Sequence, residues 1–312
     1  MAGTFTHWMI VESALRRFGE LPAGHRLFPV LADRSDYVAL GSIGPDYPYL
    51  AEGARKQPRG QSWAERMHCE RTADFVVRGL ENLQHLGGAD FELALAWLCG
   101  FATHLVADTI VHPVVNATVG GLAQFQAREH HHCEMVQDCY LYHELTGLEI
   151  ADGGHLSRLD GCSHPADPER LNPTVAASWT RTLRDNHPGA GASLAGIDPD
   201  GWHAHVSRGA RALTDAGAER ARENGQEPPA PRRSSELGAD ELERYVHAVR
   251  LPGGRTGHFQ RDVFGRVVDE VLAVWGRLLA DVARGDPEGC RAYLGNWDLD
   301  RGVDADAPYF WR

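Results

Sequence analysis

Hydrophobic residues recur along most of this 312-residue chain with the spacing of amphipathic helices. The clearest case is 259–285, where the apolar positions follow the 3.6-residue period of an α-helix. Residues 6–18 carry the same pattern, and the segment 123–146 ends at Gly147, a typical helix stop. No run alternates with period two, so the pattern predicts no sheet. The sequence therefore predicts an all-α fold, in one multi-helix domain over residues 1–312.

Two further helices follow from stop and start signals. Ser62 and Glu65 have the spacing of a capping box, which opens a helix that runs to His85. Asp90 can cap the next helix. This helix is expected to bend or stop directly before Pro113, because proline lacks the amide hydrogen and clashes with the preceding turn.

The pattern divides the chain into an N-terminal half with the candidate site residues and a C-terminal half that completes the fold. We expect residues 1–150 to carry the candidate site, and helices within 174–300 to complete the helical domain around it. The other predicted segments are a loop-rich stretch at 19–60, an irregular one at 151–173, weaker helices at 174–186, 201–223 and 239–250, and a loop near 226–235.

Composition places the chain among ordinary globular proteins but limits its partners. Apolar residues make up 43% and charged residues 24%, and the net charge is −12. A sequence-independent nucleic-acid binder needs a basic surface, and stable adsorption to anionic membranes uses lysine and arginine clusters. Nucleic acid is therefore an improbable partner.

The chain carries no visible targeting signal or membrane span. Its N-terminus lacks a basic segment followed by an apolar core and a cleavage site. The longest apolar run, around Leu93–Val106, is too short for a span and contains His104. The six cysteines form no CxxC pair and read as small buried hydrophobes. These observations predict a cytoplasmic protein with reduced cysteines.

A column of metal-ligand types lies inside that apolar run. His104, Asp108 and His112 are four residues apart, and a helix places such residues on one face, about 5–6 Å apart. Burying the carboxylate costs several kcal/mol unless it is paired. Zinc accepts imidazole nitrogen and carboxylate oxygen, so a metal ion is an economical partner.

A second column follows at His130, Glu134 and Asp138. About two pairs of histidine and acid at this spacing are expected by chance in such a composition, and the chain has three, the third being His258 and Asp262. Spacing alone is thus weak evidence, and a single histidine on an apolar helix is more often a core residue. The combination of two columns predicts a site for more than one zinc ion, built from nitrogen and oxygen ligands.

Three residues outside the columns join this hypothesis. His7 lies on the first helix, Asp46 in a turn rich in glycine and proline, and His68 in the middle of the helix that Ser62 opens. Their simplest interpretations are a turn aspartate and core imidazoles. We interpret eight other histidines as surface residues: His25, His85, His155, His164, His187, His203, His205 and His247.

Taken in chain order, these residues resemble the bacterial zinc-dependent phospholipase C family and the related single-strand nucleases. The resemblance covers about residues 4–142. It is carried by Thr6-His7-Trp8, Gly41-Ser-Ile-Gly-Pro-Asp46, and His104-x3-Asp108 with His112-Pro113. It implies an all-helical fold that binds zinc, with two or three ions here.

The resemblance also implies how the first two ions are held. Asp46, His68, His104 and Asp108 would hold one zinc, and Asp108 would bridge to a second that His7 also binds. Secreted family members add a processed N-terminal tryptophan as a ligand. Six residues precede His7 in this chain, so we expect that ligand to be missing and the second ion to be weak or absent.

The third ion is assigned in the same way to His112, His130 and Glu134. The secreted enzymes place their counterpart of His112 two residues farther from the bridging aspartate. Three residues therefore remain rival ligands: Asn116, His131 and His132. We expect Asp138 to orient one of the ligating imidazoles from behind.

The resemblance implies a zinc-dependent hydrolase that cleaves a phosphoric ester, in which metal-activated water attacks phosphorus. Asp46 would be both a ligand and the candidate catalytic base. The substrate would be a lipid or a small-molecule phosphoester. Two alternatives stay open: a non-catalytic, metal-stabilised helical binding protein, and a phosphatase or nuclease that acts on a soluble substrate.

Overall fold

The computed structural model describes residues 3–19, 26–52, 62–190, 196–213, 232–304 and 307–311. The elements of the N-terminal half are α1 (Thr4–Gly19), α2 (Phe28–Asp33), α3 (Ser35–Ser42), α4 (Tyr47–Glu52), α5 (Trp63–Cys69), α6 (Thr72–Leu83), α7 (Gly88–Val119) and α8 (Ala123–Thr146). Those that follow are η1 (His155–Ser157), α9 (Arg158–Gly161), α10 (Pro173–Asn186), α11 (Pro199–Ala212), η3 (Ser234–Glu236), α13 (Ala239–Leu242), η4 (Glu243–His247), η5 (Phe259–Phe264), α14 (Gly265–Arg284), α15 (Glu288–Tyr293) and η6 (Tyr309–Trp311).

The all-α class is confirmed. Among the described residues, β structure is limited to short two-stranded ladders that pair β1 (Ser163–His164) with β2 (Asp167–Leu171), β3 (Val249–Arg250) with β4 (Thr256–Gly257), and β5 (Val303–Asp304) with β6 (Ala307–Pro308). The predicted absence of any sheet was therefore wrong only at these ladders.

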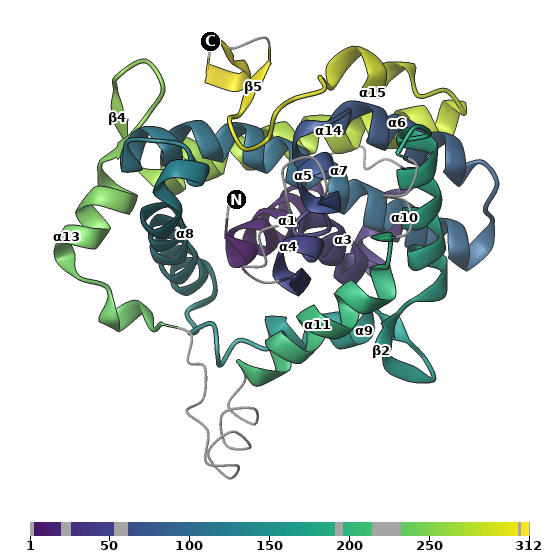
Figure 1. The fold of residues 1–312 in the computed structure, drawn as a ribbon, viewed down its shortest axis with the longest axis horizontal. Helices are drawn as coiled ribbons and strands as arrows, with labels where there is room; N and C mark the ends of the chain where they lie inside the picture. Colours follow the sequence, from purple (N-terminus) through teal and green to yellow (C-terminus); the bar gives the residue numbers. More distant parts are fainter. Residues whose placement is uncertain are drawn as a thin grey trace.

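Helix α7 is the centre of the fold, and α1, α3, α6, α8, α10 and α14 all pack against it (Figure 1). Its residues from Ala94 to Val115 are buried on every side. A helix that is apolar all round belongs inside a protein, because it has no face to offer to water. The histidines and the aspartate of its column are thus carried into the middle of the core.

Helix α3 crosses α7 at a pair of glycines. A Cβ atom on Gly41 would lie 2.0 Å from the Trp97 carbonyl oxygen, and one on Gly100 would lie 2.0 Å from the Val38 carbonyl oxygen. Any side chain at either position would force the two helices apart. This close approach brings the end of α3, and the turn that follows it, against the metal-ligand column of α7.

Two predictions for the N-terminal half were wrong. The stretch predicted as loop-rich, 19–60, contains α2, α3 and α4 within its described part. The helix predicted from Ser62 to His85 is broken into α5 and α6. Ser62 does cap α5, since its hydroxyl accepts the Ala64 amide hydrogen. The break lies at Arg71, the non-glycine residue with positive φ (55°), whose carbonyl accepts a hydrogen bond from Asn186 at the end of α10.

The central helix was expected to bend or stop directly before Pro113, and it does not stop there, since α7 continues to Val119. The proline leaves the Thr109 carbonyl without its helical donor. Gly302, from the C-terminal end of the chain, packs against Thr109 and the Pro113 ring at this point. Tertiary contacts therefore cover the irregularity that was expected to end the helix.

The later helices agree with the pattern in part. The prediction at 259–285 is confirmed as η5 followed by α14, and that at 174–186 as α10. The helix predicted at 239–250 is instead α13, η4 and strand β3. Helix α11 covers the start of the predicted 201–223 helix, whereas 214–231, with most of the predicted loop at 226–235, lies outside the described residues.

One helix in the described part of the chain, α7, is long and apolar enough to cross a membrane by length and composition. The apolar window that meets this test is wholly buried inside the protein. This helix is thus accounted for by the core. The six cysteines are free thiols, and all except Cys69 are buried.

Candidate metal centre

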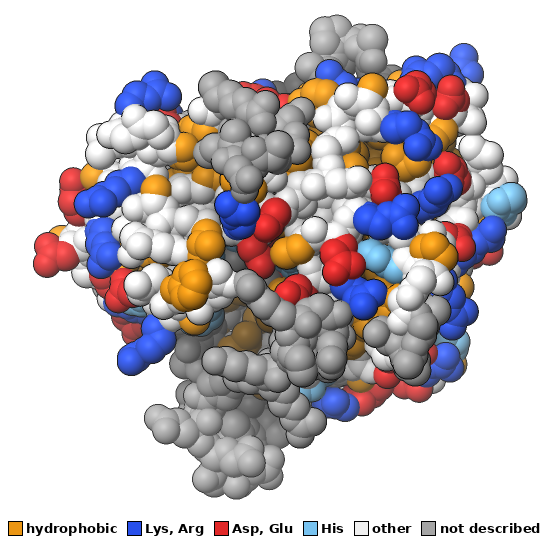
Figure 2. Space-filling view, turned by 45° about the horizontal axis from the view of Figure 1, so that its top comes forward, with side chains coloured by type: hydrophobic (Ala, Val, Ile, Leu, Met, Phe, Trp, Pro, Cys, Tyr) orange, Lys and Arg blue, Asp and Glu red, His pale blue; other side chains and the backbone are white. Residues whose placement is uncertain are grey.

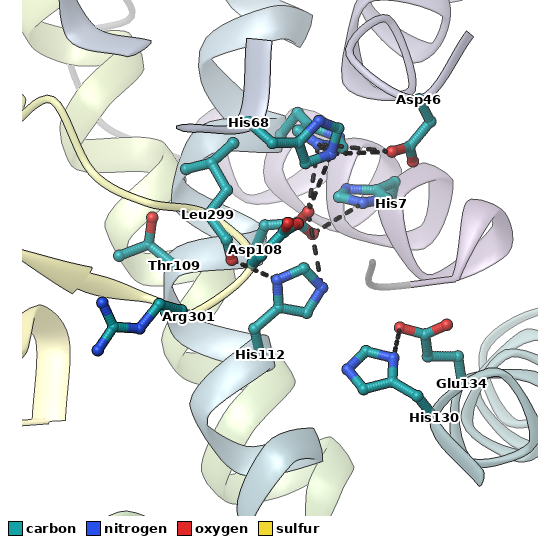
Figure 3. Close-up of polar contacts among 12 residues, drawn as sticks. His7, Asp46, His68, Asp108, Thr109, His112, His130, Glu134, Leu299 and Arg301 are labelled. Atoms are coloured by element: carbon teal, nitrogen blue, oxygen red, sulfur yellow. Dashed lines mark hydrogen bonds and ion pairs between the residues drawn. The ribbon is translucent and has the colours of Figure 1, made fainter. Parts of the chain in front are cut away.

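Five side chains, those of Asp108 and four other residues, meet in the core. His7 comes from α1, Asp46 from the turn after α3, and His68 from the last turn of α5 (Figure 3). His104 lies on α7, one turn before Asp108. Each of the five is at most 2% exposed. We refer to these residues as the Asp108 cluster.

The contacts within the Asp108 cluster are short. The His7 Nε2 atom lies 3.3 Å from Asp108 Oδ1, and the His104 Nε2 atom lies 3.3 Å from Asp108 Oδ2. The His68 Nε2 atom is 3.1 Å from Asp46 Oδ1 and 3.8 Å from Asp108 Oδ2. The ligand-type atoms of two triplets, His7 with Asp46 and His104, and His68 with His104 and Asp108, lie within 4.8 Å of one another.

A second group lies beside the cluster, between α7 and α8. His112, His130 and Glu134 also bring their ligand-type atoms within 4.8 Å of one another, and we call them the His130 group. The His112 and His130 rings are 5.5 Å apart, and His130 Nδ1 lies 2.9 Å from Glu134 Oε1. In Figure 3 the His130 and Glu134 pair faces the His112 ring across the gap between the two helices.

Three of the imidazoles are held from behind by main-chain carbonyls. The Nδ1 atom of His68 donates to the Ala64 carbonyl (2.7 Å), and that of His104 donates to the Ser42 carbonyl (2.9 Å). The Nδ1 atom of His112 donates to the Leu299 carbonyl. A carbonyl only accepts, so each Nδ1 carries the hydrogen and each Nε2 points into the site.

This arrangement fits a bound cation. The Nε2 atoms of His68 and His104 lie 3.3 Å from each other and next to two carboxylates, so the site needs positive charge, which protons on the rings or a bound cation can supply. Lone pairs and carboxylate oxygens repel one another unless a positive charge lies between them. Ligating histidines commonly donate their other ring nitrogen to a carbonyl, and zinc takes nitrogen and oxygen ligands of these kinds.

The His130 group also fits a bound cation, because it contains buried ring nitrogens without hydrogen-bond partners in the described part of the chain. The Nε2 atoms of His112 and His130 are buried and have no hydrogen-bond partner among the described residues. A buried ring nitrogen without a partner is costly, and metal coordination removes that cost. The donor set of both groups therefore suits zinc.

The protonation states favour the same interpretation. Burial would raise the pKa of Asp46, but the charges of His104 and His68 hold it below the ordinary aspartate value. The pKa of Asp108 is held well below its ordinary value, against burial, by His112 and His104. Burial lowers the pKa of His112 to about 4, so this imidazole is neutral near pH 7. Against burial, the hydrogen bond to Asp46 raises the pKa of His68 to about 9, so this ring carries a proton that a bound metal ion would displace. The ionised carboxylates and the neutral His112 ring are already in the forms that bind a metal.

Asp138 does not have the predicted role. It was expected to orient a ligating imidazole, but its carboxylate accepts the amide hydrogens of Thr6 (2.7 Å) and Phe5 (3.2 Å). These amides belong to the first turn of α1 and have no partner within the helix. Asp138 thus caps α1 from α8, and fixes the turn that carries His7.

The rival ligands for the third ion lie elsewhere. His131 is exposed, and His132 pairs with Glu241 at 2.8 Å. The Asn116 side chain donates to the Asp300 carbonyl at 3.1 Å. Of the candidates for this position, His112 is the one that lies with His130 and Glu134.

Three histidines that were interpreted as surface residues are buried. His155 bonds to Glu12 and to the Tyr142 hydroxyl, and His203 bonds to the Ser163 and Tyr47 hydroxyls. His187 is buried against the Trp63 ring. Each of these imidazoles has a structural partner far along the chain, which no local pattern could reveal.

Leu299 is a site residue that the sequence analysis missed. Its carbonyl accepts from the His112 ring, and its amide hydrogen donates to the His68 carbonyl at 2.8 Å. Both contacts use main-chain atoms, so residue types gave no signal for them. They bring the C-terminal end of the chain directly to the metal centre.

Comparison with known families identifies this architecture. A family model described as zinc dependent phospholipase C matches residues 6–186, more than half of the chain. The chain belongs to the zinc-dependent phospholipase C family. The match confirms the resemblance and spans all eight predicted ligands of this family member. Comparisons with curated proteins and with solved structures give no match.

Proposed function

We propose that this zinc-dependent phospholipase C family member is a hydrolase that cleaves a phosphoric ester. The observation that carries the proposal is the inward direction of the three Nε2 atoms of His68, His104 and His112, toward the carboxylates of Asp46 and Asp108. A hydrolytic zinc site needs buried nitrogen and oxygen donors that the protein holds in fixed positions, and these residues supply them.

The ligand sets follow from which atoms lie together. Asp46, His68, His104 and Asp108 would hold one zinc, and Asp108, with one oxygen near His7 and the other near His104, suits a bridge to a second. The His130 group would hold a third. Bound zinc would supply electrophilic charge for the phosphoryl oxygens and would lower the pKa of water.

Asp46 is the proposed catalytic base. Its Oδ1 atom is held by His68, which leaves Oδ2 to take the proton of the attacking water. The lowered pKa keeps the carboxylate ionised, as a base must be before it accepts a proton. The two glycines of the α3–α7 crossing fix the helix end from which the Asp46 turn departs.

The proposed substrate is a lipid or small-molecule phosphoester, as family membership suggests. On the face shown in Figure 2, arginine side chains alternate with aspartate and glutamate and form no continuous basic surface. The net charge of −12 points the same way. A sequence-independent nuclease needs a basic surface, so we rank nucleic acid below the phosphoester substrates.

One observation favours a second candidate, a closed metal centre that stabilises the fold. The five residues of the Asp108 cluster are at most 2% exposed. A cavity of about 650 Å³ lies between α10 and α11, and none of the eight candidate ligands lines it. Structural zinc sites are closed, whereas catalytic ones keep an open position for water or substrate.

A chelator experiment separates the two candidates. The enzyme should hydrolyse a chromogenic phosphodiester or phosphomonoester, lose this activity in chelator, and recover it with zinc. The variant Asp46→Asn should be inactive, whereas Asp33→Asn, an exposed control on α2, should match the wild type. A zinc-loaded protein that turns over no phosphoester on a broad panel would establish the closed, structural centre instead.

A further inference from the structure

The C-terminal end of the chain crosses the metal centre as an ordered segment. Residues Trp297–Gly302, which we call the C-terminal strap, follow α15 and lead into β5 (Figure 1). Leu299, at the middle of the strap, is completely buried. The family model ends at residue 186, so this segment lies outside the matched region.

The strap is fastened to α6 and to α7, the helix that carries three of the candidate ligands. Before the metal centre, the Thr72 hydroxyl donates to the Trp297 carbonyl at 3.0 Å. After it, the Asn116 side chain donates to the Asp300 carbonyl at 3.1 Å. These bonds hold the strap on α6 and α7, on both sides of Leu299.

Leu299 then serves two candidate ligands through its main chain. Its amide hydrogen donates to the His68 carbonyl, which lies in the last turn of α5 and has no helical donor there. Its carbonyl accepts the Nδ1 hydrogen of His112 (Figure 3). The first contact fixes the end of α5, and the second fixes the direction of the His112 ring.

The His112 contact is the more specific of the two. The acceptors behind His68 and His104 are the Ala64 and Ser42 carbonyls, both inside the matched region. The acceptor behind His112 comes from residue 299. Among the described residues, the other polar contact of the ring is Asp108, whose Oδ2 lies 3.8 Å from Nε2, so the Leu299 carbonyl is what fixes the ring from its Nδ1 side.

Gly302 permits this close approach. It has a positive φ of 62°, and a Cβ atom there would lie 2.3 Å from Pro113 Cγ and 2.6 Å from the Thr109 carbonyl oxygen. Both atoms belong to the turn of α7 around His112. A side chain at residue 302 would therefore push the strap away from this turn.

We infer that the C-terminal strap is a positioning element of the metal centre, and that it sets the affinity of the ion bound by the His130 group. This inference rests on the proposed zinc site. The residue that orients His112 would thus lie outside the region that the family model matches. Loss of a group that orients a ligating histidine typically weakens metal binding 10–100-fold, so an effect of about that size is expected.

The test compares two glycine variants of the full chain. Gly302→Ala displaces the strap, whereas Gly285→Ala introduces alanine at a similar φ of 71° in open surroundings. For each variant, bound zinc per chain and its affinity are measured by chelator competition, and the visible spectrum of the cobalt-substituted protein reports the ligand geometry. The melting temperature of the metal-free protein records any general loss of stability.

In Gly302→Ala, one bound ion should become 10–100-fold weaker and its cobalt spectrum should change, with the other ions weakened much less. Gly285→Ala should bind metal like the wild type. Full wild-type affinity in Gly302→Ala refutes the inference, and so does an equal weakening of all ions in parallel with the metal-free melting temperature. If Gly302→Ala does not fold, Thr72→Val, which removes one fastening bond of the strap, decides by the same readouts.

The outcomes also distinguish this inference from the proposed function. Wild-type protein that binds no metal refutes both. Wild-type protein that binds its ions, with Gly302→Ala retaining all of them unchanged, refutes only the role of the strap.

Discussion

The Asp108 cluster and the His130 group differ in where their supports come from. The cluster gathers side chains from α1, α5, α7 and the turn after α3, and the carbonyls behind His68 and His104 belong to Ala64 and Ser42. The His130 group uses only α7 and α8 for its ligands, but the carbonyl behind His112 comes from Leu299. The rings of His68 and His104 are thus oriented from within the first 110 residues, whereas the orientation of the His112 ring depends on the far end of the chain.

Because of this difference, two neighbouring ligand groups in one core can depend on different parts of the chain. A ligand set gathered from three helices and a turn has several separate supports. A set that lies between two helices and one strap loses its geometry when any of the three moves. We therefore expect changes in the cluster to abolish activity, and changes around the His130 group to remove one ion at a time.

The largest effect should come from Asp108→Ala. Its carboxylate contacts His7 and His104 and lies 3.8 Å from His112, so it serves more candidate ligands than any other side chain of the cluster. Phosphoester hydrolysis should fall by more than about 100-fold, beyond the range for outer positioning groups, and the zinc content should fall by at least one ion. His7→Ala should lose less of both. Wild-type metal content and activity in Asp108→Ala would rule out the bridging role.

The next effect separates the two sites. His130→Ala should lower the zinc content by one ion and leave the Asp108 cluster loaded. The neighbouring variant His131→Ala changes an exposed imidazole and should stay within about 0.5 kcal/mol of the wild-type unfolding free energy, with unchanged metal. Elemental analysis of both variants provides the measurement. Equal metal loss in both, or in neither, would mean that His130 is not a ligand.

The sequence predicted the columns because their spacing is local. Four-residue repeats on α7 and α8 place candidate ligands on one face whatever surrounds them. The boundaries of α8 were predicted as they stand, since Gly147 adopts the positive φ of a helix end. The prediction that Ser62 caps a helix was also correct, because the cap joins residues two positions apart in the chain.

The supports could not be predicted, because main-chain atoms and distant partners provide them. Leu299 has no residue type that suggests a carbonyl behind His112. The path of α7 through Pro113 depends on Gly302, which is 189 positions away in the chain. Asp138 reads as a third member of a ligand column, and only the position of α1 shows that it caps Phe5 and Thr6 instead.

A moderate effect is expected at Asp138. Asp138→Ala leaves the first-turn amides of α1 without their acceptor, which should cost about 1–2 kcal/mol of unfolding free energy, the upper part of the range for a lost helix cap. Because α1 carries His7, the ion near His7 should also be held less tightly. Asp138→Asn keeps an acceptor oxygen and should recover part of both losses. Urea unfolding and chelator competition measure them, and an Asp138→Ala variant that behaves like the wild type in both would refute the capping role.

The smallest effect should come from Ser62→Ala. The hydroxyl caps α5 at the end remote from His68, so its loss should cost about 1 kcal/mol of unfolding free energy. The zinc content should not change, because His68 is fixed at the other end of α5 by the strap and by Asp46. A fall in zinc content in this variant would show that the position of His68 depends on the N-terminal cap of α5.

The most direct test of the account is the metal content of the purified protein, measured per chain with identification of the element, in protein that has never met a chelator. The two groups of donors predict two or three zinc ions per chain. Less than one metal ion per chain would contradict the metal centre, and with it the hydrolase that is built on it.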